Sequence, residues 1–346
     1  MKKRNGTNNP LQNFASVPPC YCSKGHIGGL MAFRRSLRAL AKRPTREDAF
    51  LFDNNGFFQL RGALSTEEVA ALNAGIDAAA GESVERSTEA LKNTKAGSGM
   101  SAKGSRTDLG GMLSWDGAPG AAFRSLLCHP KCKPFLEAFL GVGYRLDHQP
   151  LCLIQGPDSE GFQLHGGPLD SNGSFNPELQ YRFGAGGTMW NSLVGMSVSL
   201  VDQEDGDGGF CILPGSHKSN FPLPPDFRHG DSSAFREFIH TPHTKAGDVI
   251  FFSEATIHGA LPWRSQDKQR RLALYRFAPA NMGYGRAYTE NWGDSSLETK
   301  CTEDEWSVLQ PPYAPRMDRK LVGREINERT QAKKDHDLRI FGTKYF

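Results

Sequence analysis

Short apolar runs, each bounded by Gly, Pro, Asn or Asp, fill the chain from about residue 144 to residue 279 and limit its possible folds more than any other feature. The runs are "YRLDHQPLCLIQG", "GFQLHGG", "LVGMSVSLVDQ", "GGFCILPGSH", "AGDVIFFSEATIHG" and "RRLALYRFAP". Several short strands at this spacing, with turn residues between them, indicate an antiparallel sandwich or barrel. The chain's 38 glycines and 21 prolines favour the same strand-rich, loop-rich fold.

Helical patterns come before this region. The segment 49–64 predicts a short strand after a turn, and a helix should follow it, because Ser65 and Glu68 form a capping box ahead of apolar residues at helical spacing. A second helical segment over 121–141 should break at Pro130 and end at Gly141.

The first 46 residues differ from the rest, because they are rich in Lys and Arg and contain no Asp or Glu. Acid-free leaders of this kind are typical of mitochondrial or plastid transit peptides, and a basic tail with one surface helix is the other interpretation. We therefore divide the chain into a leader (1–46), a main domain (47–285) and a C-terminal extension (286–346). Seven scattered cysteines favour an intracellular location, cytoplasmic or organellar.

The charge argues against a nucleic-acid partner, and the hydropathy argues against a transmembrane segment. The formal charge of +3 is small for 346 residues, and the basic residues form no stripe interleaved with aromatics, so a nucleic-acid partner is not expected. No apolar run approaches the ~18 residues that a transmembrane helix needs. A small molecule is the expected partner, and the oligomeric state stays open.

Two histidines and a later basic pair have the order that a mononuclear non-haem iron oxygenase needs. Such a site uses two imidazoles and one carboxylate and leaves positions open for a 2-oxo acid and dioxygen. In a β-barrel version the first His and the carboxylate lie two residues apart, the second His comes from a later strand, and an Arg on the next strand pairs with the 2-oxo acid. His165, His258, Arg270 and Arg271 follow this order.

At these residues the chain resembles the phytanoyl-CoA dioxygenase family of iron and 2-oxoglutarate oxygenases. The matching segments are "NNGFFQLRGALSTEEVAAL", "GDGGFCILPGSHK", and "AGDVIFFSEATIHGALPW" followed by "RRLALYRF". The resemblance implies a mainly β (α+β) fold, with a double-stranded β-helix (jelly roll) core and flanking N-terminal helices. It also implies that the chain is an enzyme that uses Fe(II), 2-oxoglutarate and O₂ to oxidise an aliphatic C–H of a small molecule.

Carried over residue by residue, the resemblance makes His165 and His258 the iron ligands. It assigns the 2-oxoglutarate carboxylate to Arg271, because "R-L-A" fits the family's Arg-x-Ala pattern, and side-chain alternation then directs Arg270 to the other face of the strand. Arg270 and Gln155 remain further candidates for 2-oxoglutarate binding. The residues expected to line the substrate pocket are Tyr181, Trp190 and Asn191. His217, in "PGSHK", is expected to be structural.

The family's His-x-Asp motif is His-x-Gly here, because Gly167 stands at the carboxylate position. Chloride could fill that position, as in the related halogenases, and the outcome would then be halogenation instead of hydroxylation. Alternatively, Glu254 or Asp170 could supply the carboxylate, although a Glu in "VIFFSEATIH" is otherwise expected at an exposed strand end. The third possibility is a cupin-like binding module that has lost iron-dependent turnover.

Overall fold

The computed structural model describes residues 43–86, 92–184, 187–284 and 296–312, with a few positions between 332 and 340. The leader expected over 1–46 therefore lies outside the described residues up to position 42. The contacts divide the chain into Met1–Ala41 and Lys42–Phe346, and the described helices and strands all belong to the second unit.

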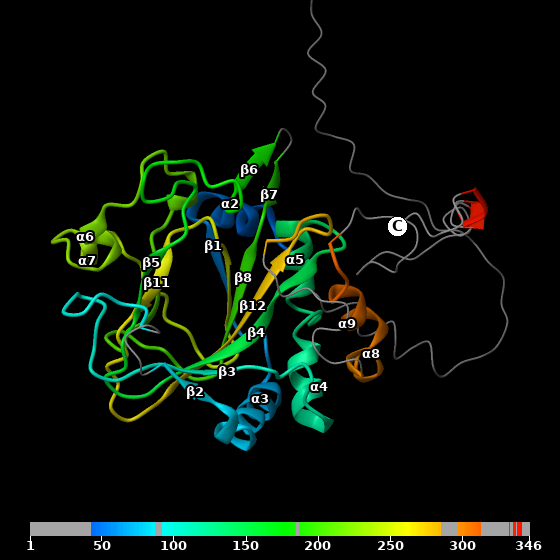
Figure 1. Cartoon of the computed structure of the whole chain (residues 1–346), viewed down its shortest axis with the longest axis horizontal. Coiled ribbons are helices and arrows are strands. Elements are labelled where there is room, and N and C mark those ends of the chain that lie inside the picture. The colour runs from blue at the N-terminus through cyan, green and yellow to red at the C-terminus, as the bar shows by residue number, and fades with distance from the viewer. Residues whose placement is uncertain are drawn as a thin grey trace, which may run out of the picture. The chain divides into compact units, whose positions relative to one another are not determined.

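Two antiparallel sheets form the centre of this unit (Figure 1). The larger sheet has the strand order β1 (Phe57–Leu60), β10 (Val249–Ser253), β8 (Val194–Ser199), β12 (Arg270–Ala278), β4 (Arg145–Gln155), β3 (Thr107–Leu109) and β2 (Val84–Glu85). The smaller sheet has the order β5 (Phe162–His165), β11 (His258–Leu261) and β9 (Gly209–Ile212), and β6 (Tyr181–Gly184) pairs with β7 (Thr188–Asn191) in a separate hairpin. This is the double-stranded β-helix with flanking helices that the sequence predicts.

Most of the described helices come before β4 or after β12 in the sequence. The helices are α2 (Arg46–Asn55), α3 (Thr66–Ala78), α4 (Gly117–Ser125), α5 (Lys133–Leu140), α6 (Pro225–Arg228), α7 (Phe235–Phe238), α8 (Leu297–Lys300) and α9 (Glu303–Val308). The Ser65–Glu68 capping box begins α3, and Gly141 caps α5, both as predicted. In Figure 1, α4 and α5 lie on one side of the larger sheet, and the smaller sheet lies on the other.

The sequence predicts only a turn and then a strand from residue 49, and a helix over Arg46–Asn55 precedes that turn. Thr45 caps α2 through a capping box with Asp48, and Gly56 ends the helix at φ 79°. A Cβ at Gly56 would lie 2.2 Å from Thr256 Oγ1, so the position requires both the left-handed backbone and the absence of a side chain. The predicted strand is β1, which begins only after this glycine.

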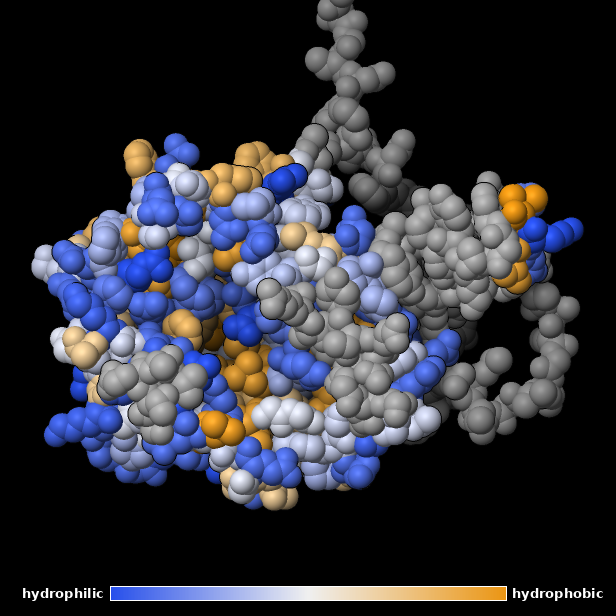
Figure 2. All heavy atoms as spheres, viewed as in Figure 1, coloured by the Kyte–Doolittle hydropathy of each residue, from blue (hydrophilic) through white to orange (hydrophobic). Residues whose placement is uncertain are grey.

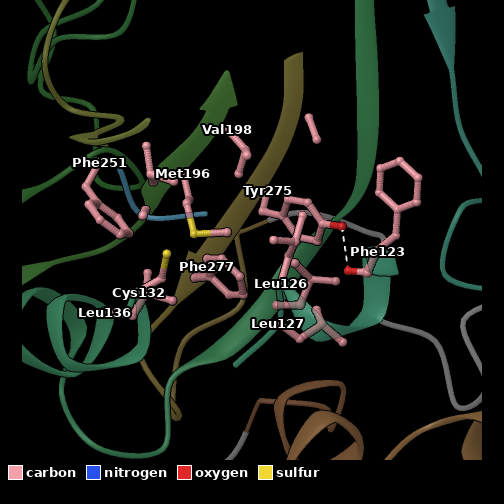
Figure 3. Close-up of a cluster of buried hydrophobic side chains, with 14 of the residues drawn as sticks. Phe123, Leu126, Leu127, Cys132, Leu136, Met196, Val198, Phe251, Tyr275 and Phe277 are labelled. Atoms are coloured by element: carbon pink, nitrogen blue, oxygen red, sulfur yellow. Dashed lines mark hydrogen bonds between the residues drawn. The ribbon is translucent and has the colours of Figure 1, made fainter. Parts of the chain in front are cut away.

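The two faces of β12 have different surroundings, and this difference positions the site. On one face, Tyr275 and Phe277 belong to the main hydrophobic core under α4 and α5, and the Tyr275 hydroxyl donates to the Phe123 carbonyl at 2.8 Å (Figure 3). On the other face, Leu272 and Leu274 belong to a separate cluster between the two sheets. Side chains alternate along a strand, so the even-numbered residues of β12 face the space between the sheets.

The core continues beyond β12 into the C-terminal part of the chain. Leu297, Val308 and Leu309 belong to the main core cluster. Beside them a fully buried ion pair joins Arg145 Nη1 to Asp147 Oδ1 at 2.7 Å. Arg145 also donates to the carbonyls of residues 282 and 310, and Asp147 Oδ1 accepts from the backbone N–H of residue 284. This pair therefore connects β4 to the segment at residues 282–284 and to residue 310 through hydrogen bonds.

Among the described residues, no helix has the length and apolarity needed to cross a bilayer. Figure 2 shows mostly hydrophilic residues on the face drawn, with apolar residues visible in a hollow near its middle.

Candidate metal centre

A cavity of about 110 Å³ lies between the two sheets. Its walls are mainly apolar, and its polar groups come from three arginines, two histidines, a glutamine and a serine. The lining residues that bear on the site are Arg106, Leu151, Leu153, Gln155, Phe162, His165, Phe210, Phe252, His258, Arg270, Leu272, Leu274 and Arg276.

Three side chains of types that bind metals lie close together, and two of them, His165 and His258, line this cavity. His165 ends β5, His258 begins β11, and the two residues are direct partners in the smaller sheet. Glu254 lies in the turn that leads from β10 in the larger sheet to β11 in the smaller one. One potential ligand atom from each of the three residues lies within 4.8 Å of the others. The change of sheet thus brings Glu254 back against His258, with Oε2 at 3.5 Å from Nε2.

Hydrogen bonds orient both imidazoles. Nδ1 of His165 lies 3.1 Å from the Gln163 carbonyl, and Nδ1 of His258 lies 2.7 Å from the Thr256 carbonyl. A carbonyl can only accept, so each Nδ1 carries the proton and each Nε2 keeps its lone pair for a metal. The rings of Phe162 and Phe252 pack against His165 and His258, each at 4.6 Å between centroids.

The three groups have the protonation states that a divalent cation needs. Burial lowers the pKa of His165 to about 3, with a smaller contribution from His258, and burial also lowers the pKa of His258. Burial alone would raise the pKa of Glu254, but the Arg276 guanidinium and the two imidazoles outweigh this effect and hold it at about 2. At neutral pH this group of three therefore offers two neutral imidazoles and one carboxylate, which is a donor set that fits a mononuclear iron site.

Glu254 is not at an exposed strand end, contrary to the expectation from its place in an apolar run. The residue is only 5% exposed, and its backbone N–H donates to the Leu193 carbonyl at 3.0 Å. Its side chain makes a salt bridge from Oε1 to Arg276 Nε at 2.7 Å. A buried carboxylate needs such compensation, and here it comes from the cavity face of β12.

A second polar group lies at the other end of β12. Arg270 is 6% exposed and lines the cavity, where its guanidinium donates to the side-chain oxygen of Gln155. Burial and the nearby Arg106 lower its pKa to about 10, so it stays cationic at neutral pH. Arg106 itself pairs with Asp108 at 2.8 Å, whereas no carboxylate of the described residues is within salt-bridge distance of Arg270.

The assignment of Arg271 to the interior of the barrel is wrong. Arg271 lies on the helix-covered face of β12, where Nη1 pairs with Asp77 of α3 at 2.7 Å and Nε donates to Gln269 at 2.9 Å. Alternation does separate Arg270 from Arg271, as predicted, but α3 covers the face that carries Arg271.

Neither Asp170 nor Gly167 faces the two imidazoles. Asp170 is exposed, and its Oδ1 accepts from the backbone N–H groups of Asn172 and Ser174 in a turn, so of the two possible substitute ligands the structure places only Glu254 beside the imidazoles. Gly167 does not line the cavity. A Cβ built there would meet Ile257 at 3.2 Å, on a backbone with φ 97°. A side chain at this position would start toward Ile257 under backbone strain.

The three residues expected in the substrate pocket do not line the cavity. The Tyr181 hydroxyl bonds to Asp53, Trp190 stacks on the Arg182 guanidinium at 5.3 Å, and Asn191 donates to the Phe139 carbonyl at 2.8 Å. All three belong to the β6–β7 hairpin, which pairs with neither main sheet. His217 is structural, as expected, and its Nε2 lies 2.9 Å from the Asp53 carbonyl.

Arg106 and Arg276 line the cavity but were not predicted from the sequence. For Arg276 a signal was present, because it follows Arg270 by an even number of residues on one strand and therefore shares its face. Arg106 comes from a Gly- and Ser-rich stretch without periodicity, which gave no such signal.

Comparison with solved structures supports the fold. HygX from Streptomyces hygroscopicus, with nickel, 2-oxoglutarate and hygromycin B bound, superposes with a TM-score of 0.55 at 21% identity, over 72% of this chain and 94% of that one. HygX with iron bound gives a TM-score of 0.54 at 21% identity, over 73% and 95%. The epimerase SnoN from nogalamycin biosynthesis, with Fe³⁺, α-ketoglutarate and nogalamycin RO, gives 0.48 at 20% identity, over 72% and 88%. A search of curated proteins finds no match.

The two sheets with a cavity between them define a protein of the double-stranded β-helix class. Within this class, the family model described as phytanoyl-CoA dioxygenase matches residues 52–272, and the chain belongs to that family.

Proposed function

We propose that this protein is an Fe(II)- and 2-oxoglutarate-dependent oxidoreductase that hydroxylates an aliphatic C–H of a small molecule. Its family supports an oxidoreductase of the dioxygenase type. The observation that carries the proposal is the convergence of Glu254 with His165 and His258, two residues that line the cavity, together with the buried Arg270 that lines it too and has no carboxylate partner among the described residues.

Each polar group of the cavity has a distinct task in this proposal. The two imidazoles and the Glu254 carboxylate would hold iron, which with 2-oxoglutarate supplies the oxidising chemistry when bound. Arg270, oriented by Gln155, pairs with the distal carboxylate of 2-oxoglutarate, because a buried guanidinium is a strong and directional anion partner. Leucines of β4 and β12 cover the space between Arg270 and the metal ligands and exclude water from it.

The position of Glu254 favours hydroxylation over halogenation. A halide needs a coordination position that lacks a protein carboxylate, and Glu254 offers an ionised carboxylate 3.5 Å from His258. A chloride ion would have to compete with this buried anion, and a side-chain position at Gly167 is directed toward Ile257. Chloride is therefore not a cofactor in the proposed reaction.

Anaerobic titration with Fe(II) and 2-oxoglutarate, with and without chloride, tests the proposal. The expected result is the weak visible charge-transfer band of the chelate, unchanged by chloride, followed by succinate formation when O₂ is admitted. The Glu254→Ala variant should bind Fe(II) more weakly and should show a chloride-sensitive band, because the substitution removes the competing carboxylate. Asp170→Ala is the matched control, since it removes an exposed carboxylate that does not face the imidazoles.

Other outcomes would point elsewhere. A chloride-dependent band in the unmodified protein would favour halogenation, and the absence of any band at saturating Fe(II) would favour the binding module without turnover. The substrate itself is a small molecule in this proposal. HygX, which has the same fold, was crystallised with hygromycin B and gives one precedent for a ligand of that size.

A further inference from the structure

We infer that Arg276 is a positioning residue that makes Glu254 bind the metal through one oxygen only. The inference rests on the proposed function, because it needs a metal at His165, Glu254 and His258. It goes beyond that function in assigning a task to a side chain that is not itself a ligand.

The geometry divides the two oxygens of Glu254 between two partners. Oε1 accepts from Arg276 Nε at 2.7 Å, and Oε2 lies 3.5 Å from His258 Nε2, on the side of the imidazoles. The main chain of Glu254 is held by its bond to the Leu193 carbonyl. Arg276 comes from β12, which belongs to the larger sheet, so the position of its guanidinium beside Oε1 does not depend on the turn that carries Glu254.

This division matters because glutamate can bind a metal through one or both of its oxygens. Octahedral iron has six positions, and two imidazoles plus one carboxylate oxygen leave three of them open. The two oxygens of a 2-oxo acid chelate take two of these, and dioxygen needs the third. If Oε1 also bound, no position would remain for dioxygen. Arg276 prevents this by holding Oε1 in a charge-assisted hydrogen bond.

Glutamate has more need of such a restraint than the family's aspartate, because its side chain is one carbon longer and can turn either oxygen toward the metal. The cavity offers little other restraint. Among the described residues, the direct partners of the Glu254 side chain are Arg276 and His258. The second of these is a metal ligand in the proposed function, so Arg276 alone would control Oε1 once metal is bound.

Crystal structures of the Mn(II)-loaded protein and of Arg276→Met test the inference. The unmodified protein should bind Mn(II) through one Glu254 oxygen, and Arg276→Met should bind it through both. Calorimetric titration of the metal-free proteins with Mn(II) should show roughly tenfold weaker binding in Arg276→Met, the size of effect that outer partners of metal ligands commonly have. Arg276→Lys should retain one-oxygen binding, because the lysine ammonium group can also donate a hydrogen bond to Oε1.

Arg271→Met is the matched control, since it removes an arginine from the opposite face of the same strand and should leave both measurements unchanged. Glu254 still bound through one oxygen in Arg276→Met would overturn the inference while leaving the proposed function intact. Mn(II) held in the unmodified protein without Glu254 would overturn the inference together with the proposed ligand set. A metal-dependent rise in the melting temperature of Arg276→Met would show that the variant is folded and loaded.

Discussion

At the scale of single residues, the site departs from its family at one position and compensates at another. Gly167 removes the carboxylate next to the first histidine, and Glu254, four residues before the second histidine, places a carboxylate beside both imidazoles. Arg276 contributes to this compensation, because its guanidinium is the largest of the influences that offset the effect of burial on the pKa of Glu254. In the proposed ligand set, the carboxylate would thus come from the turn between β10 and β11 instead of from a position next to the first histidine.

Restoring the family's motif with Gly167→Asp should not improve the site. The residue has φ 97°, and a Cβ there would lie 3.2 Å from Ile257. We expect the variant to lose about 1–3 kcal/mol of unfolding free energy and to gain no metal affinity. Thermal unfolding and metal titration would measure the two effects. A variant that bound Fe(II) more tightly than the unmodified protein would show that the new carboxylate reaches the metal.

At the scale of elements, the strands were largely predictable from the sequence, because alternation and turn residues are local signals. Helix α2 was not predicted, although Thr45 and Asp48 have the spacing of a capping box, because the segment from residue 49 was interpreted only as a turn followed by a strand. The faces of β12 were reversed for a different reason. Alternation separates Arg270 from Arg271, but which face is covered depends on α3 and its Asp77, a contact between distant parts of the chain.

Glu254 was difficult to place for a related reason. Its neighbours predict one continuous strand, whereas the chain changes sheets between β10 and β11. A turn of this kind is a tertiary feature, and it decides that the carboxylate is buried. The two histidines were easier to place, because each lies at the end of a strand whose apolar pattern is local.

The two faces of β12 can be tested with a pair of matched substitutions. Arg270→Met should weaken 2-oxoglutarate binding by about 10- to 100-fold, since a hydrogen bond to a charged group contributes about 1.5–3 kcal/mol. Arg271→Met should leave that affinity unchanged, because its guanidinium pairs with Asp77 on the other face. Calorimetry on the Mn(II)-loaded protein would compare the two variants. Equal losses would mean that the faces of the strand are not distinct in function.

At the scale of the whole molecule, the buried site links stability to pH. His165 has a folded-state pKa of about 3, against an ordinary value of 6.5, and Glu254 has about 2, against 4.5. Both values are lower in the folded protein, so the unfolded chain binds more protons as the pH falls. Stability should therefore decrease below about pH 6.5 through His165 and again below about pH 4.5 through Glu254.

The melting temperature of the metal-free protein between pH 7.5 and 5 would check the first of these effects. We expect the unmodified protein to lose stability across this interval and His165→Gln to lose less, because the variant has no imidazole at this position to protonate on unfolding. Identical pH profiles for the two proteins would contradict the assigned role of His165.

The buried pair of Arg145 and Asp147 sets a lower limit on the length of a foldable fragment. The family match ends at residue 272, yet this pair also bonds to the backbone of residues 282, 284 and 310. A fragment cut at the end of the match would lose those bonds, most of β12 and the core residues Phe277, Leu297 and Val308, so we expect it to be strongly destabilised. Any expression fragment meant to retain this cavity must therefore extend at least to Gln310.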